Sequence, residues 1–213
     1  MGAKGNVMKS STLMEEITNT IINYEKGIIF SIHDFYHLGT KNSVKSSLLR
    51  LEKKGEIVRL IDGMYTNPEY SKIINELSYP SVDELANKIA EKFSWTICPS
   101  GDHALNTLGL STQVPSKYIY ISNGPYRKYE YQNIEIIFKH SSNRYIMDYS
   151  RNILLIIQAI KTLGIENITE EIIRKLGIMC RKYSIEDLLM RTNKLPNWIY
   201  EILVQIDKHK MDA

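Results

Sequence analysis

The sequence predicts an α+β protein of two domains, and three observations support this fold class. Apolar residues recur at three- and four-residue steps near both ends of the chain, which is the pattern of helices packed on a core. Short runs rich in Ile and Tyr, bounded by Asp-Gly and Asn-Gly, indicate strands between them. The chain has 213 residues, 43% of them hydrophobic, and is long enough for one large or two small domains. We expect a disordered N-terminus at 1–11, an N-terminal domain at 12–75, and an α+β domain at 81–213 that ends in a helical bundle.

Helix signals open the first domain. Apolar residues at helical spacing predict a helix at 12–24, which Gly27 ends. A β-like run at 28–30 follows, and Ser31 is a candidate N-cap for a second helix at 32–38.

The first domain continues with a helix and a strand pair. The third helix is expected at 42–54, closed by Gly55. Segments 56–60 and 64–67 flank Asp62-Gly63, and Asp-Gly is a strong hairpin signal. The order helix, short strand, helix, helix and hairpin is that of a winged helix-turn-helix.

The helix at 42–54 carries the main candidate site. Its apolar stripe of Val44, Leu48 and Leu51 faces the core, whereas the opposite side is basic and polar, with Glu52 as the only acid. Lys and Arg neutralise phosphates, and Arg, Asn and Ser can read base edges in the major groove. The predicted DNA contacts, including one on the wing, are Thr40, Lys41, Asn42, Lys45, Ser46, Arg50, Lys53 and Arg59.

Two alternatives stay open for this helix. The basic face can be simply solvated, and winged helices also serve as protein-interaction modules. Leu49 lies among the cations, where it can contact a thymine methyl group or pack under Tyr36 or Leu38.

The second domain is expected to mix strands with helices. A linker with a helical segment is expected at 68–80, and Ser81 with Glu84 forms a capping box for a helix that runs to Phe93. Strands are predicted at 95–98, 118–122 and 134–139, with a short helix between the first two. The predicted terminal helices lie at 151–163, 169–181, 185–192 and 196–208, and their apolar stripes are either core or a dimer face.

Residues 124–144 interleave aromatic and basic side chains, a combination that suits stacking on bases and holding a phosphate backbone. The alternative, slightly favoured, is the edge of a hairpin, because Tyr has high β-propensity and Lys discourages aggregation at an edge. The candidates for a second nucleic-acid surface are Tyr126, Arg127, Lys128, Tyr129, Lys139 and Arg144.

Catalysis is not expected. His33 and His37 have the i, i+4 spacing of metal ligands, but the Glu of a zincin motif and a third ligand are missing. Ser100, Asp102 and His103 cluster in sequence, which does not make a triad, because adjacent side chains point in different directions. We interpret this cluster as a helix start, with Ser100 or Asp102 as the cap. We predict no enzyme activity, no metal and no cofactor.

The overall composition limits the kinds of partner and site that we expect for this protein. The net charge of +3 and the pI of about 8.7 are mild, so any nucleic acid must be bound by a local patch. The two cysteines are far apart and outside any CxxC motif, which argues against a disulfide framework or a zinc site. The longest apolar run is far shorter than the roughly 20 residues of a membrane span, and the first residues lack the apolar segment of a signal peptide. We expect a cytoplasmic protein without membrane contact.

Two segments carry a family resemblance. The string SLLRLEKKGEIVRLIDGMYTNP contains a recognition helix, an arginine strand and a Gly-x-Tyr wing, and WTICPSGDHALNTLGLSTQVPSKYIYISNGP contains a helix ending in Gly-Leu, a strand and an Asn-Gly turn. With these, the chain resembles the antitoxin family of abortive-infection (AbiEi-like, type IV) toxin–antitoxin systems over most of residues 15–200.

The resemblance implies a cytoplasmic repressor that binds operator DNA upstream of its own genes through the winged helix. It implies a nucleotidyltransferase-like toxin as functional partner, countered without a stable complex, and a C-terminal domain that is needed for antitoxin action. It supports Asn42, Lys45, Ser46, Arg50 and Arg59 as DNA contacts. The oligomeric state, monomer or dimer, stays open, as do a protein-interaction module and a nucleic-acid-processing enzyme as alternative functions.

Overall fold

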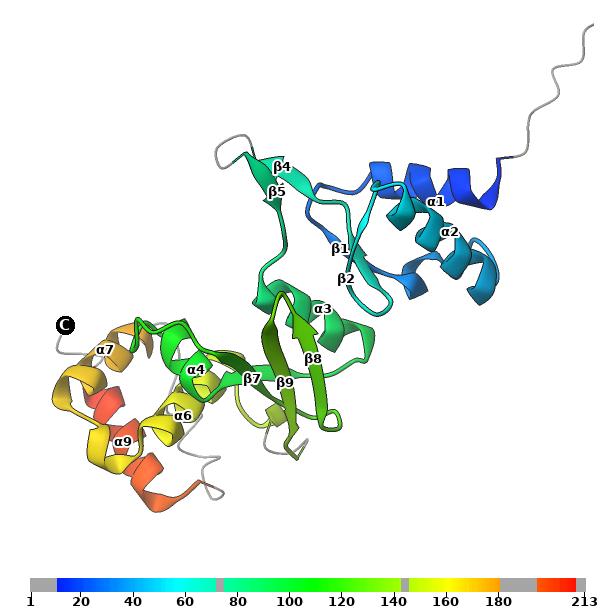
Figure 1. Cartoon of the computed structure of the whole chain (residues 1–213). Coiled ribbons are helices and arrows are strands. Elements are labelled where there is room, and N and C mark those ends of the chain that lie inside the picture. Colours follow the sequence, from blue (N-terminus) through cyan, green and yellow to red (C-terminus); the bar gives the residue numbers. More distant parts are fainter. Residues whose placement is uncertain (1–10, 72–74, 143–145, 181–194, 210–213) are drawn as a thin grey trace, which may run out of the picture. The chain divides into compact units, whose positions relative to one another are not determined.

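A computed structural model of the chain describes residues 11–71, 75–142, 146–180 and 195–209 (Figure 1). It is a mixed α+β structure, as the sequence predicts. The chain forms two compact units, Met1–Lys92 and Phe93–Ala213, which we describe separately.

The first unit has the element order expected of a winged helix-turn-helix. Helix α1 (Leu13–Ile22) is followed by strand β1 (Ile29–Ser31), the 3₁₀ helix η1 (Ile32–Phe35) and helix α2 (Lys41–Lys53). Strands β2 (Val58–Ile61) and β3 (Met64–Thr66) form the wing, and the antiparallel sheet has the order β1-β3-β2. Figure 1 shows α1 and α2 side by side over this sheet.

Local signals explain where these helices begin. The hydroxyl of Thr12 accepts a hydrogen bond from the backbone N–H of Glu15, and the Glu15 carboxylate accepts one from the backbone N–H of Thr12, which is a capping box. Thr40 caps α2 through the backbone N–H of Ser43. The apolar faces that follow these caps meet in one core, formed by Ile17, Ile21, Phe30, Ile32, Phe35, Val44, Leu48, Leu51, Ile57 and Tyr65.

Two predicted elements of this unit are wrong. The helix expected at 32–38 is only η1, because its single capped turn ends at Phe35 and the chain continues in turns. The segment at 68–80 is not helical. It forms an antiparallel hairpin of β4 (Glu69–Ser71) and β5 (Glu76–Ser78), in which Tyr70 lies opposite Leu77.

Helix α3 (Val82–Lys92) begins at the predicted capping box, where Ser81 and Glu84 exchange hydrogen bonds. We expected this helix to open the second domain. It belongs to the first compact unit, because it packs against β1.

The second unit contains a four-stranded sheet of order β6-β7-β9-β8. Its strands are β6 (Ile97–Ser100), β7 (Lys117–Ser122), β8 (Arg127–Tyr131) and β9 (Ile134–His140). Strands β7 and β9 are parallel, and the other neighbours are antiparallel. Strand β8 is an edge strand of this sheet, within the segment for which the sequence favours the edge of a hairpin.

Helices complete the second unit. They are α4 (Asp102–Thr107), α6 (Arg151–Leu163), η2 (Ile165–Asn167), α7 (Glu170–Cys180) and α9 (Asn197–Lys208), and the helix expected at 185–192 lies outside the described residues. The apolar stripes of α6 and α9 are buried in one cluster, which decides that they are core: Ile153, Ile156, Ile157, Ile160, Ile202, Leu203 and Ile206. No helix in the described part of the chain is long and apolar enough to span a membrane.

Candidate nucleic-acid interface

Helix α2 divides cleanly into a buried and an exposed side. Val44 and Leu48 are fully buried, and Leu51 is 1% exposed. These side chains hold the helix against α1 and η1, so its orientation within the unit is set by the core. Because the buried side of α2 is fixed by the core, the direction in which its polar side faces is fixed as well.

The exposed side of α2 carries every DNA contact that the sequence predicts for this helix. Thr40, Lys41, Asn42, Lys45, Ser46, Arg50 and Lys53 are all exposed. The first turn contains no acidic residue, so the N-terminal N–H groups and Lys41 lie together at the positive end of the helix dipole. Such an end favours an anion, and phosphate oxygens bind there in many proteins.

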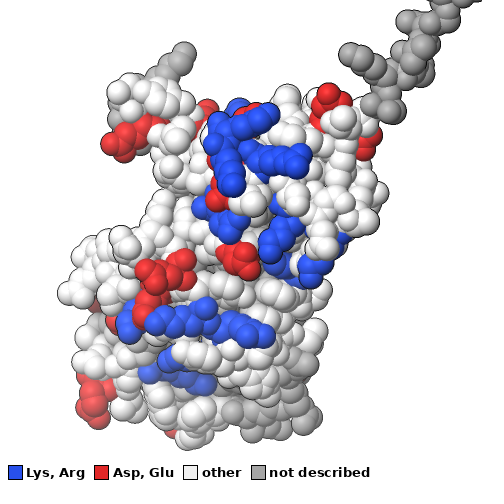
Figure 2. Space-filling model, turned by 45° about the vertical axis from the view of Figure 1, so that its right-hand side comes forward, with Lys and Arg blue, Asp and Glu red and all other residues white. Residues whose placement is uncertain are grey.

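The charges on this side are unbalanced. Lys54 pairs with Glu56 at 3.7 Å, and Glu52 is bound by Arg59, so the nearby acids are already engaged. No acidic side chain in the described residues forms an ion pair with Lys41, Lys45, Arg50 or Lys53. Figure 2 shows Lys and Arg side chains gathered on one face of the first unit. Four cations without acidic partners along the exposed half of one helix are suited to neutralising phosphates.

Arg59, the predicted wing contact, has a different environment. Its guanidinium donates a 2.9 Å hydrogen bond to Glu52, lies 4.0 Å from the carboxylate of Asp62, and sits 5.5 Å from the centre of the Tyr65 ring. Partial burial opposes its charge, but Tyr65 and Glu52 outweigh burial and raise its pKa. Arg59 is thus held at the surface by an ion pair that joins the wing to α2, and a DNA phosphate would have to replace Glu52 as its partner.

The wing turn follows the predicted hairpin. Gly63 has a φ of +71°, a conformation that glycine adopts without strain, and the Asp62 side chain is fully exposed. A carboxylate at this tip repels phosphate, so the cationic surface of the unit lies on α2 rather than at the tip of the wing.

The second candidate surface is a sheet edge with its own ion pairs. The carboxylate of Glu135 on β9 pairs with Lys117 on β7 at 3.0 Å and with Lys128 on β8. These ammonium groups, Lys128 first, lower the pKa of Glu135. Tyr129 packs edge-on against Phe138, whereas Tyr126, Arg127 and Lys139 are exposed.

The hairpin interpretation of this segment is therefore confirmed for its backbone, because β8 pairs with β9 at the edge of the sheet. Arg144 lies outside the described residues. Among the described residues of this set, Arg127 and Lys139 are the cations that form no ion pair.

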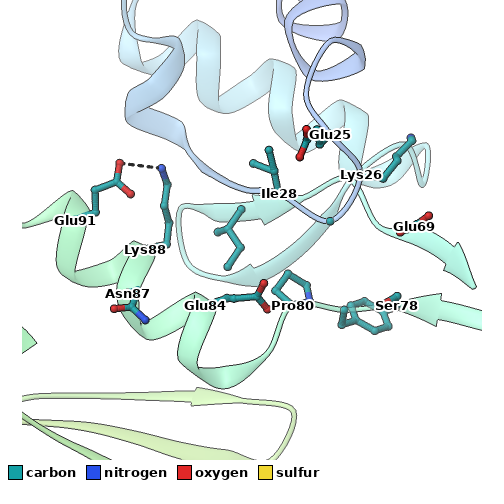
Figure 3. A pocket seen from close by; sticks show the side chains of 13 residues that line it. Glu25, Lys26, Ile28, Glu69, Ser78, Pro80, Glu84, Asn87, Lys88 and Glu91 are labelled. Carbon is teal, nitrogen blue, oxygen red and sulfur yellow. Dashed lines mark hydrogen bonds and ion pairs between the residues drawn. The ribbon is translucent and has the colours of Figure 1, made fainter. Parts of the chain in front are cut away.

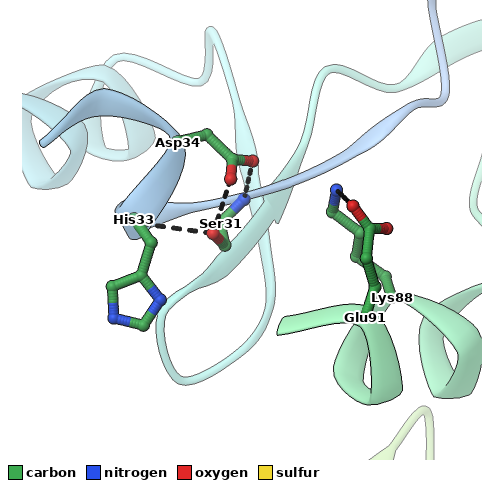
Figure 4. Close-up of polar contacts among 5 residues, drawn as sticks. All are labelled: Ser31, His33, Asp34, Lys88 and Glu91. Carbon is green, nitrogen blue, oxygen red and sulfur yellow. Dashed lines mark hydrogen bonds and ion pairs between the residues drawn. The ribbon is translucent and has the colours of Figure 1, made fainter. Parts of the chain in front are cut away.

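The two candidate metal-binding histidines do not share a helix face. His33 lies in η1, whose first turn is held by Ser31 and Asp34 (Figure 4), and His37 follows after η1 has ended. Partial burial, followed by the charge of Lys92, lowers the pKa of His33. No cluster of three or more His, Cys, Asp or Glu side chains suited to a metal occurs among the described residues.

Ser100, Asp102 and His103 do not converge either. The Ser100 hydroxyl donates a 3.0 Å hydrogen bond to Gln158, while Asp102 is exposed and His103 is buried beside the rings of Tyr118 and Tyr120. Neither Ser100 nor Asp102 caps α4, because Gly101 occupies that position with no side-chain hydrogen bond.

Cys98 is fully buried, and burial raises the pKa of its thiol to about 12. A thiolate is the reactive form of cysteine, so this thiol is unsuited to nucleophilic chemistry at neutral pH.

With this geometry in place, the comparison with protein families gives one match. The model of a family of unknown function, DUF6088, matches residues 16–188, which include all of α2, the wing and the four-stranded sheet. The chain belongs to the DUF6088 family. No curated protein matches it. Because the family description names no activity, the function of this DUF6088 protein has to be inferred from its residues.

The DUF6088 protein also has an open groove of about 590 Å³ within its first unit (Figure 3). Its rim carries two lysines and four glutamates: Lys26, Lys88, Glu25, Glu69, Glu84 and Glu91. Lys88 pairs with Glu91 at 3.2 Å, and Lys26 donates a 2.7 Å hydrogen bond to Asn67. A rim of this composition disfavours phosphate, which sets the groove apart from the α2 face.

Sequence reasoning missed the role of Glu52 in this DUF6088 protein, because it treated the residue as a lone acid beside the cationic face. The Glu52–Arg59 pair spans seven residues and depends on β2 turning back along α2. The only signal for it in the sequence was one acid and one base on neighbouring predicted elements.

Proposed function

We propose that this protein is a DNA-binding transcriptional autorepressor that acts as the antitoxin of a type IV toxin–antitoxin system. The observation that carries DNA binding is the exposed side of α2, where Lys41, Lys45, Arg50 and Lys53 have no acidic partner among the described residues. A winged helix-turn-helix places its second helix in the major groove, and this side of α2 has the side-chain chemistry for that position.

The antitoxin role is supported by the resemblance to AbiEi-like antitoxins. That resemblance includes both the α2–wing segment and the segment around β6, α4 and β7, which belongs to the second unit. It implies that the first unit represses the operon and that the second unit is required to counter a nucleotidyltransferase-like toxin.

DNA binding is tested with the full chain and labelled DNA from immediately upstream of its own gene, compared with scrambled DNA of equal length over a salt series. We expect preference for the upstream fragment. If Lys41, Lys45 and Lys53 each neutralise one phosphate, they contribute about −2.7 to the slope of log K against log salt concentration. Equal, weak binding to both fragments would contradict autorepression.

The antitoxin role is tested by co-expression with the neighbouring nucleotidyltransferase-like gene. We expect the chain to restore growth without co-purifying with the toxin. A double variant, Lys45→Ala with Arg50→Ala, is expected to lose repression of an operon reporter while still restoring growth, because the two tasks are assigned to different units.

One feature favours a protein-interaction module as a second candidate function. Tyr70 and Leu77 lie opposite each other in the β4–β5 hairpin and Tyr79 follows β5, and the three side chains are 53%, 41% and 42% exposed. Exposed apolar side chains grouped in this way are typical of protein contacts. A stable stoichiometric complex with the neighbouring gene product, lost on Leu77→Ser, together with no DNA retardation, would favour this function over the first.

A further inference from the structure

The centre of the cationic side of α2 is occupied by an apolar side chain. Leu49 is 39% exposed and lies between Lys45, Arg50 and Lys53 in the sequence of α2. Among the described side chains that form or pack on the core of the first unit, Leu49 is absent, whereas Tyr36 and Leu38 are present. Leu49 is therefore accessible to a partner that approaches this side of α2.

Helical geometry places Leu49 between the cations. At 100° per residue, Lys45 and Lys53 lie about 40° to either side of Leu49, each about one turn away along the helix. Asn42 lies about 20° from Leu49 around the helix and about two turns toward the N-terminus. The fully buried Val44 and Leu48 lie on the other side of the helix. A duplex held by the flanking lysines would therefore meet Leu49 and Asn42 first.

The major groove offers one apolar group, the C5-methyl of thymine. Lysine side chains that reach outward to the phosphates on both sides leave the middle of the helix facing base edges. An apolar side chain at that place gains free energy only where it covers an apolar group of the base pair, since it leaves a base-edge donor or acceptor unpaired elsewhere.

We propose that Leu49 is a specificity-determining residue that contacts a thymine methyl group, so that the preferred site contains a thymine opposite the centre of α2. This inference rests on the proposed DNA binding and adds the class of base pair that is read. Asn42, on the same stripe, has the amide that suits an adenine edge next to it.

The test removes the methyl group without changing the base pairing. The upstream fragment is prepared once with thymine and once with deoxyuridine in its place, and the affinity of the full chain is measured for both. Burial of one methyl group corresponds to about fourfold in affinity, so we expect the thymine fragment to bind at least about fourfold more tightly.

The Leu49→Ala variant gives the decisive comparison, because replacing thymine everywhere also changes the DNA itself. We expect this variant to bind both fragments equally. Ile22→Ala is the matched control, because Ile22 is an exposed apolar residue of α1, 66% exposed, and its loss should leave the thymine preference of the native chain intact. Leu49 is exposed, so the variant is expected to fold, and its thermal unfolding is recorded alongside.

Two outcomes overturn the inference. In one, the native chain binds both fragments equally while still preferring the upstream sequence over scrambled DNA, which leaves the proposed function standing. In the other, Leu49→Ala retains the full thymine preference. If the native chain does not distinguish upstream from scrambled DNA, the proposed function fails and this inference fails with it.

Discussion

The guanidinium of Arg59 donates a 2.9 Å hydrogen bond to the carboxylate of Glu52, so strand β2 is joined to the last turn of α2. The pair is partly exposed, with 36% and 29% of the two side chains accessible, and pairs of this kind contribute about 0–1 kcal/mol to stability. Its larger effect is on charge, because each residue neutralises the other at the border of the cationic side of α2.

Replacing Glu52 by Gln is expected to tighten binding to DNA of any sequence. The substitution removes the acid at the border and leaves only Asp62, at 4.0 Å, as an acidic neighbour of Arg59. A phosphate that takes the place of Glu52 on Arg59 makes the salt slope steeper by about 0.9. Fluorescence anisotropy over a salt series measures both quantities. Glu171→Gln is the control, because it frees Lys175 in α7 with the same change in net charge. An equal gain in both variants would show that only net charge matters.

Lys45→Ala is expected to weaken binding to upstream and scrambled DNA by the same factor. Lys45 is exposed with no acidic partner among the described residues, so its contribution is that of a phosphate contact, and the salt slope falls by about 0.9. The measurement is a salt titration on both fragments, with Lys175→Ala as the control. A loss confined to the upstream fragment would contradict a phosphate contact and indicate a base contact.

Arg50→Ala is expected to reduce the preference for the upstream fragment by about 1–3 kcal/mol, the range for a side chain that reads a base. Binding to scrambled DNA should change much less. Arg50→Lys separates the two roles, because lysine keeps the charge and loses the bidentate geometry that recognises guanine. Full preference in Arg50→Lys would mean that Arg50 contributes charge alone.

The stability of the fold is expected to fall in alkaline solution because of Cys98. Burial raises its thiol pKa from 9.0 to about 12, so above pH 9 the unfolded chain loses a proton that the folded chain keeps. Between pH 9 and 12 this lowers the free energy of unfolding by about 1.4 kcal/mol per pH unit, and below pH 9 the group has no such effect. Urea unfolding of the native chain and of Cys98→Ala at pH 8, 9, 10 and 11 checks this. Parallel curves for the two proteins would contradict it, because the other titrating groups are common to both.

Gly124→Ala is expected to destabilise the second unit by about 1–3 kcal/mol. A methyl group built on Gly124 would lie 2.2 Å from the indole of Trp95, closer than any packing allows, so the ring or the backbone must move. Thermal unfolding measures the loss. The companion variant, Trp95→Leu, removes the ring, and adding Gly124→Ala to it should cost much less. If the stability losses of Gly124→Ala and Trp95→Leu simply add in the double variant, the clash with the Trp95 ring is not the reason for the loss.

The residues on the exposed side of α2 could be predicted from the sequence, because the side of a helix that each residue occupies depends on nearby residues alone. The core residues Val44, Leu48 and Leu51 and the exposed residues of the helix follow from its 3.6-residue period, and Thr40 and Gly55 mark its ends. The side that each residue occupies is therefore decided within fourteen or so residues of chain.

The hairpin at β4–β5 shows where local reasoning failed. Segment 68–80 has weak signals for either structure, and the strands form because Glu69, Tyr70 and Ser71 find backbone partners in 76–78. Strand pairing satisfies backbone groups between separate segments, so propensity within either segment does not decide it.

By itself, the sequence determined helices α1, α2 and α3, the capping box at Ser81, the wing turn and the cationic composition of α2, because each depends on neighbours a few residues away. Only the tertiary structure decided which charged side chains are free of ion pairs and can bind a partner. It brought Arg59 to Glu52, gave Lys117 and Lys128 to Glu135, buried His103 and Cys98, and left Leu49 exposed at the centre of the α2 cations. Ion pairing and burial depend on distances between segments that are far apart in the chain, and those distances exist only once the chain has folded.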